Sequence, residues 1–227
     1  MEHFATLDGV EIDDMVSLGF LLPPTPTSGM GAAEVTPQDP ISSYKFVDLS
    51  HHNAGTIYWD DDASYRLNVT VYTPLELSVA LVDVRHNVES EPAYLVTVND
   101  ILDWEKRHQR LPDGCLFIAH TGHSKLNRTP YLGIDANGER RFPAFTADAA
   151  SFLATQRNVN GVGLDTASVD ASGDGAHGAI LEANMFVIEN LANLEKLPIL
   201  GSYALALPLL LDGGSASPVR ILAMVPR

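Results

Sequence analysis

The sequence lacks features that disulfide-bonded, membrane-spanning and secreted proteins require. It contains a single cysteine, Cys115, so no disulfide bond can form within the chain. Cys115 opens an apolar run, where a lone cysteine is typical of a small buried hydrophobic residue. No hydrophobic run approaches the roughly 18 apolar residues of a membrane-spanning helix, and no basic segment followed by an apolar one marks a secretory signal. These absences predict a cytoplasmic protein.

Positive charge is also scarce. The chain has 14 Lys and Arg against 29 Asp and Glu, which gives a formal net charge of −15 at pH 7. No basic cluster is longer than Arg140-Arg141, whereas proteins that bind nucleic acid usually carry a basic patch or stripe. The same shortage weighs against an anionic membrane surface. We therefore expect neither nucleic acid nor membrane among the partners.

What remains is the composition of an ordinary globular protein, with 45% hydrophobic residues in a chain of 227. That length allows one good-sized domain with a buried core. Residues 1–45 contain Leu22-Pro-Pro-Thr-Pro-Thr-Ser-Gly-Met-Gly, a stretch of turn formers without periodicity. They are expected to form an arm or linker, and residues 46–227 the folded domain.

Apolar runs alternate with helix signals in the second part of the chain. A helix is predicted to begin at Thr97, because Asp100 three residues later is close to a capping box, and another at Thr146. Strands alternating with helices predict an α/β domain. The strands are predicted at 46–50, 75–84, 115–119, 161–164, 203–211 and 218–225.

One pair of residues indicates metal binding. His177 and Glu189 lie twelve residues apart, and the segment between them is expected to be a loop followed by an apolar β-type run that ends at the carboxylate. This arrangement can bring an imidazole and a carboxylate to one point, and both are ligands that Zn²⁺ or Mn²⁺ accepts. A catalytic metal usually has three protein ligands and an open position, so the pair is half of a site.

Further candidates for metal binding are weaker. His-x-x-His spacing occurs at metal sites but also often by chance, and acidic runs are more often solvated turns than cation sites. A serine hydrolase is disfavoured, because the sequence has no Gly-x-Ser-x-Gly motif. The weaker candidates are His51 and His52 after a strand end, His120 and His123 around a Thr-Gly turn, and the run Asp60-Asp61-Asp62.

Eight short blocks, in a fixed order, carry a family resemblance. They are Val47-Asp-Leu-Ser-His51, Trp59-Asp60, Pro74-Leu-Glu-Leu with Val82-Asp-Val-Arg85, Pro112 to Gly122, Phe142-Pro-Ala-Phe, Val162-Gly-Leu-Asp165-Thr-Ala-Ser168-Val-Asp, His177 to Glu189-Asn-Leu, and Ala206-Leu-Pro-Leu with Ser217-Pro-Val-Arg220. In this order the blocks resemble the cyclase family of metal-dependent hydrolases, which includes bacterial kynurenine formamidases.

The resemblance implies a compact α/β domain with a mixed β-sheet core flanked by helices, of the swivelling β/β/α type, assembled as a homodimer or larger homo-oligomer. It also implies hydrolysis of a small amide, most typically the arylformamidase reaction of tryptophan catabolism, from N-formylkynurenine to kynurenine and formate. Zn²⁺ or Mn²⁺ would activate the attacking water. In the resemblance His177 and Glu189 are metal ligands, Trp59 stacks on the substrate, and Asp165 is a structural carboxylate, for which binding turn N–H groups is the simpler alternative.

The sequence departs from the family where its signature, His-x-Gly-Thr-His-x-Asp-x-Pro-x-His, should lie. No histidine occurs between His52 and His86. The first residues resemble what the family places just after that block, so His3 would match its acid/base histidine, with a frayed terminal residue as the alternative. Three explanations stay open: a rearranged relative, a sequence lacking a segment, or a degenerate member that serves as a binding or scaffold module.

Overall fold

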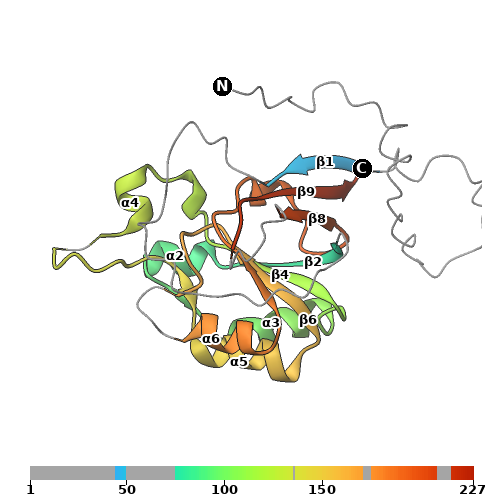
Figure 1. Ribbon diagram of the computed structural model, residues 1–227, viewed down its shortest axis with the longest axis horizontal. Coiled ribbons are helices and arrows are strands. Elements are labelled where there is room, and N and C mark those ends of the chain that lie inside the picture. The colour runs from blue at the N-terminus through green and yellow to red at the C-terminus, as the bar shows by residue number, and fades with distance from the viewer. Residues whose placement is uncertain (1–43, 50–74, 135, 171–174, 209–215) are drawn as a thin grey trace, which may run out of the picture.

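A computed structural model describes residues 44–49, 75–134, 136–170, 175–208 and 216–227 (Figure 1). Within these ranges no helix is long and apolar enough to cross a membrane. The strands are β1 (Tyr44–Asp48), β2 (Leu75–Asp83), β3 (Leu95–Val96), β4 (Cys115–His120), β5 (Ala144–Phe145), β6 (Val159–Leu164), β7 (Phe186–Ile188), β8 (Tyr203–Pro208) and β9 (Val219–Pro226). The α-helices are α2 (Arg85–Ser90), α3 (Val98–His108), α4 (Arg128–Leu132), α5 (Ala147–Gln156) and α6 (Ala176–Glu182).

The described strands form a seven-stranded mixed sheet in the order β1-β9-β8-β2-β4-β6-β7. Strands β2, β4, β6 and β7 run parallel, whereas β1, β9, β8 and β2 pair antiparallel. A small parallel pair, β3 with β5, lies apart from this sheet. The predicted α/β domain with a mixed sheet is therefore confirmed.

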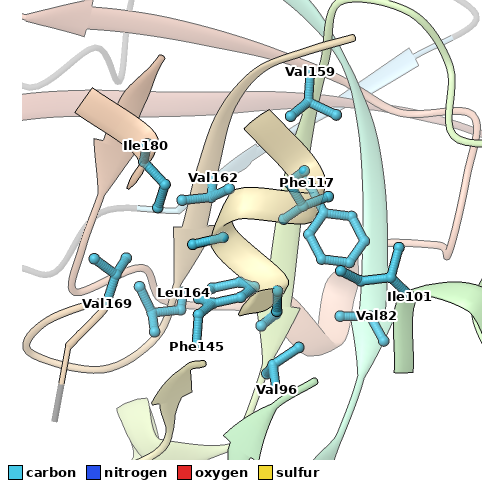
Figure 2. Close-up of a cluster of buried hydrophobic side chains, with 14 of the residues drawn as sticks. Val82, Val96, Ile101, Phe117, Phe145, Val159, Val162, Leu164, Val169 and Ile180 are labelled. Atoms are coloured by element: carbon cyan, nitrogen blue, oxygen red, sulfur yellow. The ribbon is translucent and has the colours of Figure 1, made fainter. Parts of the chain in front are cut away.

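Successive side chains of the central strands point to opposite faces of the sheet, and both faces are apolar. In β4, Phe117 packs with the helices α3, α5 and α6, while its neighbours Leu116 and Ile118 pack on the opposite side with residues of β1, β8 and β9. Figure 2 shows the helical side, where Phe117, Leu164 and Ile180 belong to one cluster of buried side chains. Because both faces of β4 are covered, all six of its residues are buried, as is typical of a central parallel strand.

Local signals placed two helices correctly. The Thr97 side chain accepts a hydrogen bond from the Asp100 backbone N–H and completes a capping box at the start of α3. Thr146 Oγ1 accepts from the Ala149 N–H at 3.0 Å at the start of α5. Cys115 is buried as predicted, and burial raises the pKa of its thiol to about 12, so the thiolate is strongly disfavoured.

The prediction for the segment after His177 was wrong. His177 lies in helix α6 rather than in a loop, and the apolar run behind it continues this helix before the short strand β7 begins. Ala176 and Ile180, four residues apart, both face the core, which is the period of a helix. The N-cap of the helix is Gly175, whose φ of 84° is in the left-handed region that favours glycine.

Candidate metal site

His177 and Glu189 meet at one edge of the sheet. β6 and β7 are parallel neighbours, so the residues that follow them lie at the same edge. His177 comes from the first turn of α6, which follows β6, and Glu189 comes directly after β7. The imidazole Nε2 of His177 lies 3.2 Å from Oε1 of Glu189. The structure thus brings together the two residues that the sequence singled out, and their role as metal ligands remains a prediction.

A third residue, Asp170, completes the cluster on the other side of the imidazole. Its Oδ2 lies 2.8 Å from Nδ1 of His177, and its Oδ1 accepts a hydrogen bond from the Ala176 N–H at 2.7 Å. Asp170 was not among the residues predicted from the sequence. The available signal was its place in the Ser168-Val-Asp170 block, seven residues before a candidate histidine.

The backbone around Glu189 is tied to the end of β6. The N–H groups of Asn190 and Leu191 donate to the carbonyls of Thr166 and Leu164, at 2.8 and 3.0 Å. Asn190 adopts a φ of 58°, a conformation that asparagine tolerates better than most residues. The carboxylate itself accepts from the Val169 N–H at 3.3 Å through Oε1. These bonds fix Glu189 relative to the loop that leads to His177.

Asp170 and Glu189 stabilise the charged form of His177, which in turn stabilises that of Asp170. Burial lowers the pKa of His177, but the hydrogen bonds and negative charges of Asp170 and Glu189 outweigh burial and raise that pKa to about 9. Burial raises the pKa of Asp170, yet its bonds with His177 and the helix N–H groups lower it overall. Without a metal at neutral pH, an imidazolium therefore lies between two carboxylates.

The His177–Glu189 pair fits a dication in ligand type and separation. Two ligands with bonds of about 2.0 Å in tetrahedral geometry lie roughly 3.3 Å apart, close to the 3.2 Å between Nε2 and Oε1. The residues that the structure describes contain no group of three or more His, Cys, Asp or Glu that could hold a metal ion. A catalytic site would need a further ligand from outside those residues.

The other carboxylate of the family resemblance, Asp165, has a structural role. It is fully buried, and its Oδ1 accepts hydrogen bonds from both the N–H and the Oγ1 of Thr121 at 2.8 Å. Ser124 approaches its Oδ2 through its N–H and Oγ, each at 3.4 Å. The alternative that Asp165 receives the N–H groups of a turn is confirmed.

His120 ends β4 and His123 follows the Thr121-Gly122 turn, and both are buried. The ring Nε2 of His123 donates to the Tyr131 carbonyl at 2.8 Å. Burial lowers the pKa of both histidines, so both favour the neutral form. They are not part of any metal-binding group within the described ranges. The remaining candidates lie outside the described residues and stay predictions: His3, His51, His52, Trp59 and Asp60 to Asp62.

Comparison with known proteins agrees with this fold. The model of the Cyclase family, described as "Putative cyclase", matches residues 47–171. An isatin hydrolase of Roseibium aggregatum is 31% identical over 158 residues, which are 66% of this chain and 59% of that protein. The match therefore spans less than two thirds of the relative's length.

Solved structures of isatin hydrolases share the architecture. One bound to the product analogue thioisatinate has a TM-score of 0.66 at 27% identity, covering 81% of this chain and 71% of the other. Isatin hydrolase A from Labrenzia aggregata has a TM-score of 0.67 at 24% identity, covering 81% and 84%, and shows likeness of fold. The chain belongs to the Cyclase family of metal-dependent hydrolases.

Proposed function

We propose that this protein hydrolyses the carbon–nitrogen bond of a small N-aryl amide with the help of a bound divalent metal. The observation that carries the proposal is the His177–Glu189 pair, held 3.2 Å apart at the sheet edge in a chain of this family. The similarity to isatin hydrolases favours a lactam such as isatin as the substrate. N-Formylkynurenine, favoured by the resemblance to kynurenine formamidases, is the second candidate, and it too is an amide of an aromatic amine.

The metal and the protein would have different roles in the reaction. A bound Zn²⁺ or Mn²⁺ would lower the pKa of water and polarise the amide carbonyl. His177 and Glu189 would hold the ion. In the overall reaction the oxygen of water adds to the carbonyl carbon, the carbon–nitrogen bond breaks, and the nitrogen gains a proton and becomes a free amine, which in a lactam stays attached to the product. For isatin the product is a ring-opened 2-aminophenyl keto acid, and for N-formylkynurenine the products are formate and the free aromatic amine.

The first test is the metal content of the purified protein after incubation with Zn²⁺ or Mn²⁺ and gel filtration. We expect near-stoichiometric metal in the wild type and its loss in the double variant His177→Ala with Glu189→Ala. His86 and Glu89 form a matched control, because they are an exposed His–Glu pair 3.7 Å apart on α2. The variant His86→Ala with Glu89→Ala should retain the metal. A folded wild type without metal would overturn the proposal.

The second test compares substrates on the metal-loaded protein. Isatin opening is followed by absorbance and N-formylkynurenine hydrolysis by release of formate. We expect the larger kcat/KM for isatin, and a loss of at least about 100-fold in Glu189→Gln, because the carboxylate would no longer hold the ion. His3→Ala reports on the predicted acid/base role of that residue. A loaded protein that hydrolyses neither substrate would favour the binding or scaffold alternative.

A further inference from the structure

We propose that Asp170 is the positioning residue of the candidate metal site. Its carboxylate fixes the imidazole of His177 with Nε2 toward Glu189, and it also organises the first turn of the helix that carries the imidazole. This inference rests on the proposed function, because it assigns Asp170 a role toward the metal that His177 and Glu189 would hold.

Three hydrogen bonds converge on the Asp170 carboxylate. Oδ1 accepts from the Ala176 N–H at 2.7 Å, and Oδ2 accepts from the His177 N–H at 3.3 Å and lies 2.8 Å from the ring Nδ1. The N-cap residue of α6 is Gly175, which has no side chain to satisfy these amides. The side chain of Asp170 is only 12% exposed, so it is held in place by these partners rather than by water.

The same geometry selects one tautomer of His177. Carboxylates, which can only accept hydrogen bonds, flank both ring nitrogens. The Asp170 contact at 2.8 Å is shorter than the Glu189 contact at 3.2 Å, so when the ring carries a single proton that proton lies on Nδ1. In the neutral imidazole Nε2 then has the free lone pair, and Nε2 is the nitrogen that faces Glu189. The opposite tautomer would lose the shorter hydrogen bond, to Asp170, and point an N–H at the position where the metal would lie. When the imidazolium gives up its Nε2 proton to a metal, Asp170 therefore keeps the remaining proton on Nδ1 and leaves Nε2 as the ligand atom.

Asp170→Asn separates this role from that of helix capping. The amide oxygen of asparagine can still accept from the Ala176 N–H, and asparagine is about as good a capping residue as aspartate. Its NH₂ group can donate to Nδ1, which favours the wrong tautomer. We expect the dissociation constant for Zn²⁺ or Mn²⁺, measured by competition with a chelator, to rise roughly 10- to 100-fold. The melting temperature of the metal-free protein should fall less than in Asp170→Ala.

Thr146→Ala is the matched structural control. It removes the Oγ1 cap at the start of α5, a helix that packs on α6. Its melting temperature should fall by roughly 2–4 °C with an unchanged dissociation constant for the metal. Equal losses of metal affinity in Thr146→Ala and Asp170→Asn would mean that Asp170 acts only through the stability of the helix, and would overturn the inference.

The tautomer provides a readout that needs no metal. Nitrogen-15 NMR of the metal-free protein at about pH 10.5, above the pKa of His177, should show the Nδ1–H form in the wild type and more Nε2–H form in Asp170→Asn. His177→Gln identifies the signal among the eight histidines. A wild type that binds no metal would overturn the proposed function. The NMR measurement would still test whether Asp170 sets the tautomer of His177. Identical tautomers in wild type and Asp170→Asn would overturn the inference even if metal binds.

Discussion

At the scale of single residues, His177 couples the stability of the metal-free fold to pH. Its pKa is lowered by burial but raised overall to about 9 by Asp170 and Glu189, compared with an ordinary 6.5. A raised pKa stabilises the fold by at most about 3 kcal/mol. This contribution is fully present below about pH 6.5, and it is lost as the pH rises through about 9.

The prediction is tested by urea unfolding of wild type and His177→Gln in the presence of a chelator. The difference in their free energies of unfolding should shrink between pH 6.5 and pH 10. Asp170 does not blur this window, because its lowered pKa places its titration in acid. A difference that stays constant from pH 6.5 to pH 10 would contradict the stabilisation of the His177 imidazolium by Asp170 and Glu189.

Asp165 should behave as a structural residue, in contrast to His177 and Glu189. Its buried carboxylate accepts two hydrogen bonds from Thr121 at 2.8 Å, and Asp165→Ala would leave both donors unsatisfied. We expect a loss of about 2–4 kcal/mol in the free energy of unfolding, measured by urea denaturation, with metal content retained in the folded protein. A variant of normal stability that has lost its metal would instead make Asp165 a ligand.

At the scale of elements, the packing of β6 against β7 depends on Gly161. A Cβ added there would lie 2.5 Å from the ring of Phe186, its partner on β7. We expect Gly161→Ala to cost about 1–3 kcal/mol in unfolding free energy and to weaken metal binding, because β7 carries Glu189 at its end. Adding Phe186→Ala should make the pair cost less than the sum of the two single changes.

Gly178 is the control for this prediction. Gly178 is a helical residue next to His177, and a Cβ added there would meet no atom within 4 Å apart from its chain neighbours and the backbone of its own helix. Gly178→Ala should therefore stabilise the fold by about 0.5–1 kcal/mol, because alanine has the higher helix propensity. If both glycine variants were equally destabilised, loss of glycine flexibility, not the contact with Phe186, would be the cause.

Elements were predictable where their determinants are local. α3 and α5 begin at Thr97 and Thr146 because each threonine caps the helix that directly follows it. α6 was mistaken for part of a strand because its start is fixed from a distance, by Asp170 six residues before Ala176. An apolar run of that length does not reveal its period without these contacts.

At the scale of the whole molecule, strand order depends on contacts that no local pattern contains. β1 pairs with β9, at the opposite end of the chain, and that pairing sets one edge of the sheet. The candidate site shows the same limit. Spacing and resemblance singled out His177 and Glu189, but they meet because β6 and β7 run side by side, and Asp170 joins them through the loop that follows β6.

The contacts of β1 also define how much of the chain the fold needs. Val47 and Leu49 are buried, the Leu49 N–H donates to the Ile221 carbonyl at 2.9 Å, and the Leu49 carbonyl accepts from the Ala192 N–H at 2.8 Å. Residues 1–45 are expected from the sequence to form an arm. We therefore expect a chain that begins at residue 44 to melt within about 3 °C of the full chain.

A chain that begins at residue 50 should instead lose about 3–6 kcal/mol of unfolding free energy, because it leaves the cavities of Val47 and Leu49 empty. It also exposes the edge of β9, whose backbone groups pair with β1. The double variant Val47→Ala with Leu49→Ala in the full chain separates these causes, since it removes the side chains and keeps the strand. Calorimetry and urea denaturation of the four proteins measure each effect. Equal stability of the chains starting at 44 and 50 would show that β1 is dispensable, and that the folded unit begins at β2.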